Sequence, residues 1–146
     1  MVPERRIYEP SQRLVRGRIL LSLAIVTPLG FLCKLYAGPG HRWLNNSAAG
    51  LLYEIFWCLV LFFIWPRRRY ATRIAVVVLA VTSLLEVLQL WHPWLLEQVR
   101  AAFLGRALIG TTFSWGDFPF YVLGCALGWL WMRALARPPR DQESIE

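Results

Sequence analysis

Cysteine, histidine and charged residues are all scarce in this sequence. Only three Cys and two His occur among its 146 residues, and charged side chains make up 17% of it. Cys33, Cys58 and Cys125 all lie in apolar stretches, without a C-x-x-C pair and without a nearby pair of histidines. Zinc sites and disulfide frameworks require such spacings. We therefore predict no metal and no cofactor, and interpret the cysteines as small packing residues.

The formal net charge of +7 does not have the distribution that nucleic-acid binding would require. In a nucleic-acid-binding protein the basic side chains form a patch or stripe on one surface. Here they flank the apolar stretches, as the topology signals of membrane proteins do. We therefore expect no nucleic acid among the partners.

Long apolar stretches, in contrast, occupy nearly half of the chain. A membrane-spanning helix needs about 20 mostly apolar residues, and 57% of this sequence is hydrophobic. The sequence predicts an all-α fold, a four-helix transmembrane bundle over residues 19–135, with a basic cytoplasmic tail (1–18) before it and a cytoplasmic tail (136–146) after it. The predicted spans are Ile19–Tyr36, Ala48–Trp65, Ile74–Trp91 and Phe118–Leu135. We expect Asn45, Asn46 and Ser47 to provide the cap of the second helix.

The distribution of arginine predicts the orientation of the bundle. Twelve of the 16 basic residues fall on one side: Arg5, Arg6, Arg13, Arg16, Arg18, Arg67, Arg68, Arg69, Arg73, Arg133, Arg137 and Arg140. The other side has Lys34, Arg42, Arg100 and Arg106. By the positive-inside rule, both termini are expected in the cytoplasm.

The connection between the third and fourth spans is longer than a hairpin requires. Residues 92–117 lie outside the predicted spans, and long connections in compact domains are often functional. Within 94–104 the apolar residues recur at helical spacing, which predicts a short interfacial helix in this extracytoplasmic loop. A cap that simply covers the bundle is the alternative.

Ionisable residues inside the apolar stretches are the candidate functional residues, because lipid penalises them by several kcal/mol. Glu54 and Glu86 are predicted at matching depth, roughly 8–9 Å below the outer surface at about 1.5 Å per residue. Lys34 lies near the outer end of the first span, and Asp117 begins the fourth. Each span therefore brings a charged residue to the outer layer.

Helical spacing places the polar residues of three spans on stripes. The stripes are Gly50, Glu54 and Trp57, then Thr82, Glu86 and Gln89, then Asp117, Tyr121, Gly124 and Gly128. A Gly-x-x-x-Gly pair allows a neighbouring helix to approach closely. We expect the stripes to face one another inside the bundle.

Each candidate also has a structural interpretation. Glu86 and Gln89 could only hydrogen-bond neighbouring helices. Glu54 could balance the charge of Lys34. Asp117 could cap the fourth helix, because Asp is a favoured cap residue.

Several segments resemble families of membrane proteins. The pattern Glu86-x-x-Gln89, Gly105-Arg106, Asp117 and Tyr121-x-x-Gly124 resembles that of VanZ-like proteins. The phrase from Gly110 to Phe118, Gly-Thr-Thr-Phe-Ser-Trp-Gly-Asp-Phe, is similar to a bacterial family of small integral membrane proteins of unknown function, over roughly residues 30–133. VanZ-like proteins usually carry Asn in place of Tyr121 and an early Lys-x-x-His that has no counterpart here. The resemblance implies the bacterial inner membrane and a link to the cell envelope.

Two functions are compatible with these features. In the first, an outer cluster binds a lipid-linked or amphipathic ligand from the outer leaflet, with Arg106 and Lys34 holding a phosphate or carboxylate. The candidate residues are Lys34, Glu54, Glu86, Gln89, Arg106, Asp117 and Tyr121. In the second, the protein is a non-catalytic scaffold or accessory subunit, with another membrane protein or a second copy as partner. No nucleophile–base pair is recognisable, so the sequence favours a protein that is not an enzyme, although one acid could act as a general base.

Overall fold

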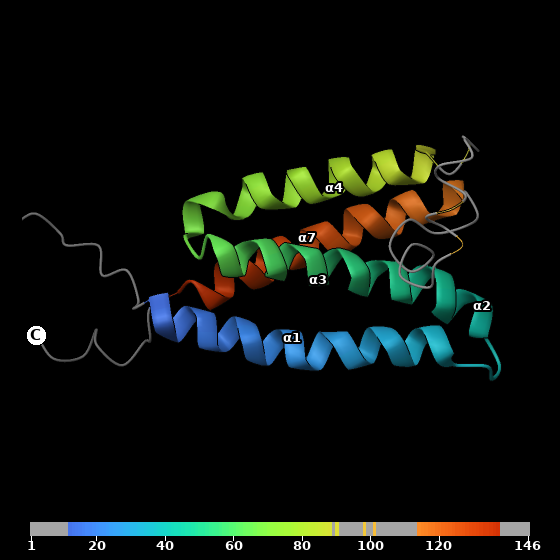
Figure 1. Ribbon diagram of the computed structural model, residues 1–146, viewed down its shortest axis with the longest axis horizontal. Coiled ribbons are helices and arrows are strands. Elements are labelled where there is room, and N and C mark those ends of the chain that lie inside the picture. Colours follow the sequence, from blue (N-terminus) through green and yellow to red (C-terminus); the bar gives the residue numbers. More distant parts are fainter. Residues whose placement is uncertain (1–11, 89, 91–97, 99–100, 102–113, 138–146) are drawn as a thin grey trace, which may run out of the picture.

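The computed structural model describes residues 12–88, 90, 98, 101 and 114–137. Within these residues all regular structure is helical, and four long helices run antiparallel to their neighbours along the chain (Figure 1). This confirms the predicted all-α class. The predicted interfacial helix at 94–104 falls almost entirely outside the described residues.

The chain forms long helices joined or preceded by short helical turns. In order they are α1 (Gln12–Leu35), α2 (His41–Trp43), η1 (Leu44–Ala48), α3 (Ala49–Ile64), η2 (Arg68–Tyr70), α4 (Ala71–Leu88), η3 (Trp115–Asp117) and α7 (Phe118–Leu135). Four continuous segments are long and apolar enough to cross a membrane: Gln12–Leu35, Leu44–Ile64, Arg68–Leu88 and Trp115–Leu135. They are consistent with a multi-pass membrane protein.

Three helix starts differ from the prediction: those of α1, of the second span and of α4, which begins at Ala71 rather than Ile74. α1 begins at Gln12 rather than Ile19, because arginine is a good helix former and the hydrophobic pattern marks only the apolar part of a helix. The second span begins at Leu44 through the π-helical turn η1, so the expected cap at Asn45–Ser47 is wrong. These residues lie inside that turn. The chain instead enters α2 through Gly40, whose φ of 77° suits glycine.

α3 is the central helix of the bundle. It packs against α1, α4 and α7, and α4 also packs against α7, whereas α1 packs mainly on α3 (Figure 1). Between these helices lies an apolar core that includes Ile19, Leu59, Phe62 and Met132, each completely buried. The outward faces carry many exposed apolar side chains, as the lipid-facing surface of a membrane helix would.

Glycine brings α7 unusually close to α3. A Cβ built on Gly124 would lie 2.7 Å from both Glu54 Cβ and the Leu51 carbonyl oxygen, and one built on Gly128 would lie 2.9 Å from Cys58 Cβ. No side chain fits at either position without a shift of the helices. The close approach predicted for the Gly-x-x-x-Gly pair is therefore present.

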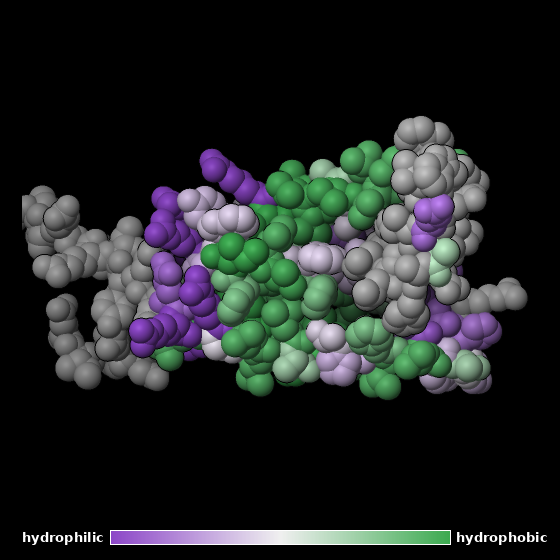
Figure 2. Space-filling model, in the orientation of Figure 1, coloured by the Kyte–Doolittle hydropathy of each residue, from purple (hydrophilic) through white to green (hydrophobic). Residues whose placement is uncertain are grey.

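The two ends of the bundle differ in charge. Hydrophilic side chains are concentrated at one end, on the left of Figure 2, which is here called the arginine end. It contains Arg13, Arg16, Arg18, Arg67, Arg68, Arg69, Arg73, Arg133 and Arg137. The opposite end, here called the Lys34 end, contains the end of α1, the last described residues of α4 and the start of α7 (Figure 1). An apolar belt separates the two ends.

Candidate functional site

Glu86 connects α4 to the segment that begins α7. It is 2% exposed. Its Oε1 accepts a hydrogen bond from the backbone N–H of Ser114 at 2.9 Å, and its Oε2 accepts one from the Tyr121 hydroxyl at 2.8 Å. Hydrogen bonds to a charged acceptor are the stronger kind. Glu86 therefore fixes the first turns of α7 against α4.

Glu54 connects α3 to α7 at a deeper level. It is completely buried, and its Oε2 accepts a hydrogen bond from the Cys125 thiol at 3.1 Å. Thr82 of α4 lies beside the same carboxyl, but its hydroxyl donates to the backbone carbonyl of Val78 at 2.9 Å. Among the described residues, nothing forms a hydrogen bond with Glu54 Oε1. One weak donor is thus the main polar partner of a fully buried carboxyl.

Lys34 and Asp117 lie at the surface of the Lys34 end. Lys34 is exposed, and its Nζ donates to the backbone carbonyl of Asn45 at 3.2 Å. It forms no ion pair with Glu54 in the described structure, so the proposed charge balance between these two residues is not observed. Asp117 is half-buried and makes no side-chain capping bond at the start of α7. Its role as a helix cap is therefore not observed either.

Tyr121 is the residue around which the acids gather. Its hydroxyl donates a hydrogen bond to Glu86, and Asp117 and Glu54 are the other acids near the phenol. Glu86 and Lys34 are in turn the charged groups that act on Asp117. The edge of the Tyr121 ring covers Gly50, where a Cβ would lie 3.5 Å from it. The three polar stripes therefore meet inside the bundle.

The two glutamates do not lie at matching depth. Glu86 is level with Tyr121, whereas Glu54 is level with Cys125, one helical turn further along α7. A turn of four residues corresponds to roughly 6 Å. The difference arises because the second span begins at Leu44, so Glu54 lies further from the Lys34 end than its position after Ala48 suggested. The site consequently has an inner level and an outer level.

Two predicted site residues, Gln89 and Arg106, lie outside the described residues. The structure brings together Glu54, Glu86, Asp117 and Tyr121, with Lys34 near Asp117 at the surface. Sequence reasoning missed Cys125 and the backbone of Ser114 as hydrogen-bond donors. Cys125 is one residue from the polar stripe of α7, so helical spacing alone gave a weak signal for it. A backbone N–H gives none.

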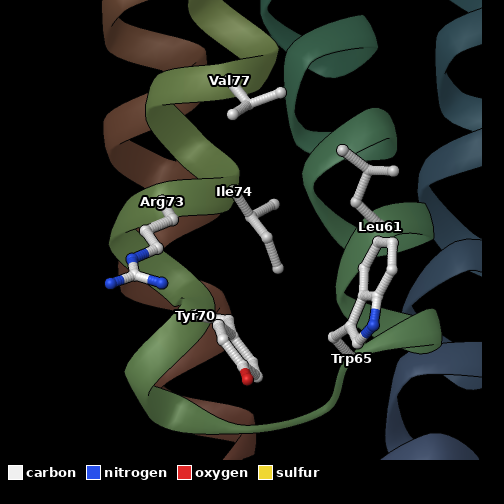
Figure 3. A pocket seen from close by; sticks show the side chains of 6 residues that line it. All are labelled: Leu61, Trp65, Tyr70, Arg73, Ile74 and Val77. Carbon is white, nitrogen blue, oxygen red and sulfur yellow. The ribbon is translucent and has the colours of Figure 1, made fainter.

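Within the described segments, no group of three His, Cys, Asp or Glu residues is arranged to hold a metal ion. A groove of about 330 Å³ opens between α3 and α4, but at the arginine end (Figure 3). Its lining contains none of the predicted site residues. Hydrogen bonding and charge are therefore the chemistry that the site at the Lys34 end offers.

Comparison with known proteins places these residues in a family context. Residues 40–125 match the model of a family described as a protein of unknown function, DUF2809. The match covers more than half of the chain and includes Glu54, Glu86, Asp117 and Tyr121, but it begins after Lys34. No curated protein and no solved structure matches the chain.

Proposed function

The chain belongs to the DUF2809 family of proteins of unknown function, and from this premise we propose that it is a multi-pass protein of the bacterial inner membrane that binds a lipid-linked or amphipathic ligand at its Lys34 end. The positive-inside rule places the arginine end in the cytoplasm and the Lys34 end at the outer leaflet. The ligand would present its polar headgroup to Asp117 and Lys34.

The observation that carries this proposal is the position of Asp117. Asp117 stands at the start of α7, but its side chain does not cap the helix. The residue is half-buried near the buried Glu86. Glu86 disfavours the negative charge of Asp117 and Lys34 partly offsets that effect, so a hydrogen-bond donor or cationic group of a ligand would stabilise the carboxylate further. Ionisable residues kept at membrane depth are functional more often than not.

The residues would have different tasks. Asp117 would accept hydrogen bonds from hydroxyl or amino groups of the ligand, and the exposed ammonium of Lys34 would pair with a phosphate or carboxylate. Glu86 and Tyr121 already bind each other, so they would hold the start of α7 in place rather than change partners. Gln89 and Arg106 remain proposed contributors from outside the described residues.

The choice of a cell-envelope ligand is supported by the resemblance to VanZ-like proteins. That resemblance rests on Glu86, Gln89, Arg106, Asp117 and Gly124. Of these, Glu86 and Asp117 belong to the polar cluster, and Gly124 lies against Glu54. Its weakest point is Tyr121, which occupies a position where Asn is usual. In this chain the position is occupied by a tyrosine whose hydroxyl donates to Glu86.

Native mass spectrometry of the detergent-purified protein tests the proposal. The wild type should retain a lipid-linked or amphipathic molecule, and Asp117→Asn and Lys34→Gln should each lose most of it. Arg13→Gln, which changes a charge at the arginine end, is the matched control and should retain it. Equal retention by all four proteins would refute binding at the Lys34 end.

A non-catalytic scaffold is the second candidate, and the hydrogen bonds of Glu86 favour it. Both carboxylate oxygens are bonded to the α7 segment, as a purely structural link would require. In that case Glu86→Gln should lower stability while Asp117→Asn changes neither stability nor any bound molecule. If Asp117→Asn alters ligand retention but not the melting temperature, the scaffold role cannot be the whole function.

A further inference from the structure

A second surface of the bundle has the form of a lipid site. The groove at the arginine end measures about 330 Å³ and is lined by Leu61, Trp65, Tyr70, Arg73, Ile74 and Val77. Figure 3 shows Leu61 of α3, Trp65 just after the end of α3, and Ile74 and Val77 of α4 around the space between the two helices. Volumes of about 300–1,000 Å³ are typical of small-molecule sites.

The walls of this groove are apolar over a defined length. From Tyr70 to Val77 the groove follows α4 for seven residues, roughly 10 Å at 1.5 Å per residue. That is about a third of the roughly 30 Å hydrocarbon core of a bilayer. The groove can therefore receive the part of an acyl chain that lies next to a headgroup.

The mouth of the groove is cationic. Arg73 lines it and is exposed, and no described side chain bonds to its guanidinium. Arg69 is held beside it, because its Nη2 donates to the Tyr70 hydroxyl at 2.9 Å and its guanidinium lies 4.7 Å from the centre of the Tyr70 ring. Trp65, 54% exposed, adds an indole of the kind favoured at headgroup level.

Among the described residues, no acid lies beside Arg69 or Arg73. The acids among the described residues are Glu54, Glu86 and Asp117, which lie in the interior or at the Lys34 end. Two other arginines of the arginine end are already engaged with aromatic rings, Arg16 with Phe63 and Arg133 with Trp129. Arg69 and Arg73 thus offer the positive charge that an anionic headgroup at this groove would meet.

We propose that the groove between α3 and α4 binds an anionic phospholipid, whose acyl chain lies along Leu61, Ile74 and Val77 and whose phosphate pairs with Arg73 and Arg69. Charge complementarity selects this occupant, because zwitterionic lipids would gain little from two cations. The inference rests on the proposal that the bundle spans a membrane. It does not depend on the site at the Lys34 end.

Native mass spectrometry after incubation with equal amounts of phosphatidylglycerol and phosphatidylcholine tests it. The wild type should retain phosphatidylglycerol in excess. Arg73→Gln should reduce that preference about fivefold, since a basic residue near the membrane surface contributes about 1 kcal/mol. Arg69→Gln should act in the same direction. Inorganic phosphate at millimolar concentration should not displace the lipid, because it lacks the acyl chain.

The matched pair Val77→Trp and Val76→Trp separates the groove from a general lipid surface. Both valines are exposed on α4, at 51% and 61%, but only Val77 lines the groove. Val77→Trp should abolish the retained phosphatidylglycerol, whereas Val76→Trp should leave it unchanged. Equal retention of the two lipids by the wild type, or equal behaviour of the two tryptophan variants, would overturn the proposal.

Two further outcomes are informative. A dimer mass without bound lipid would make the groove an interface between copies and would also overturn the proposal. Asp117→Asn should leave retention of phosphatidylglycerol unchanged, so that a failure of the Lys34-end site can be told apart from a failure of this one. Each variant should be checked for an unchanged melting temperature and a monodisperse elution profile before its lipids are compared.

Discussion

The hydroxyl of Tyr121 donates to Glu86 Oε2 at 2.8 Å, which ties α7 to α4. The same carboxylate also receives the backbone N–H of Ser114, so one side chain of α4 holds two points of the α7 segment. Both bonds are partly buried, and a hydrogen bond is stronger where water is partly excluded. The geometry of the Lys34 end therefore depends on this pair.

Tyr121→Phe removes one of those bonds without changing the ring. We expect the free energy of unfolding to fall by about 0.5–2 kcal/mol, in the range of hydrogen bonds between membrane helices. Unfolding of the detergent-solubilised protein by denaturant measures the difference. Tyr36→Phe, which alters an exposed residue at the end of α1, is the control and should have no effect. A double-mutant cycle with Glu86→Ala, which removes both acceptor oxygens, should show coupling between Tyr121 and Glu86, and additive effects would contradict a direct bond.

Gly124→Ala should weaken the contact between α3 and α7. The added Cβ would lie 2.7 Å from the Leu51 carbonyl oxygen and from Glu54 Cβ, so the helices must separate. Overpacking of this kind costs about 1–3 kcal/mol. Gly30→Ala is the matched control, because a Cβ there meets nothing within 4 Å and alanine is the better helix former. Equal melting temperatures for the two variants would show that the close approach is not required.

Glu54 should carry a proton in the folded protein. It is completely buried, and within the described structure its carboxyl accepts a hydrogen bond from the Cys125 thiol, which is too weak to compensate a charge in an apolar interior. Infrared spectroscopy should show the C=O stretch of a protonated carboxylic acid that disappears in Glu54→Gln. Glu86→Gln is the comparison and should leave that band in place. A wild-type spectrum identical to that of Glu54→Gln would mean that Glu54 is ionised.

Reporter fusions test the proposed orientation. A reporter fused after Glu146 should be active only if it is of a cytoplasmic type, and one inserted near Asn46 only if it is of a periplasmic type. The reason is the excess of arginine at one end of the bundle. The opposite pattern would place the Lys34 end in the cytoplasm, and an outer-leaflet ligand would then have no access to Asp117.

The helices and their inward-facing polar stripes could be predicted from the sequence. The different depths of Glu54 and Glu86 could not. Hydrophobic length and helical spacing are properties of one helix, and they identified four spans and the Gly124–Gly128 contact. Relative depth depends on where a helix begins. η1 extends the second span past Asn45–Ser47, polar residues that read as a cap in the sequence. Glu54 therefore lies one turn deeper than Glu86.

The hydrogen-bond donors to the two glutamates could not be predicted from the sequence either. The hydrogen bond from Cys125 to Glu54 depends on how α7 is rotated against α3, which the small size of Gly124 permits. The bond from Ser114 to Glu86 uses a backbone group that every residue type except proline possesses. Side-chain chemistry identified the acceptors correctly and could not identify these two donors.

The hydrogen-bond donors described for the two buried glutamates come from one segment of the chain, and this affects how the protein inserts into the membrane. Ser114, Tyr121 and Cys125 all belong to the α7 segment, the last of the four spans to be synthesised. Until that span leaves the ribosome, Glu54 and Glu86 lack these donors. An insertion intermediate of the first three helices would therefore lack the three hydrogen bonds that the α7 segment donates to these carboxyl groups. Insertion of the fourth helix is then the step that supplies these hydrogen bonds to both glutamates.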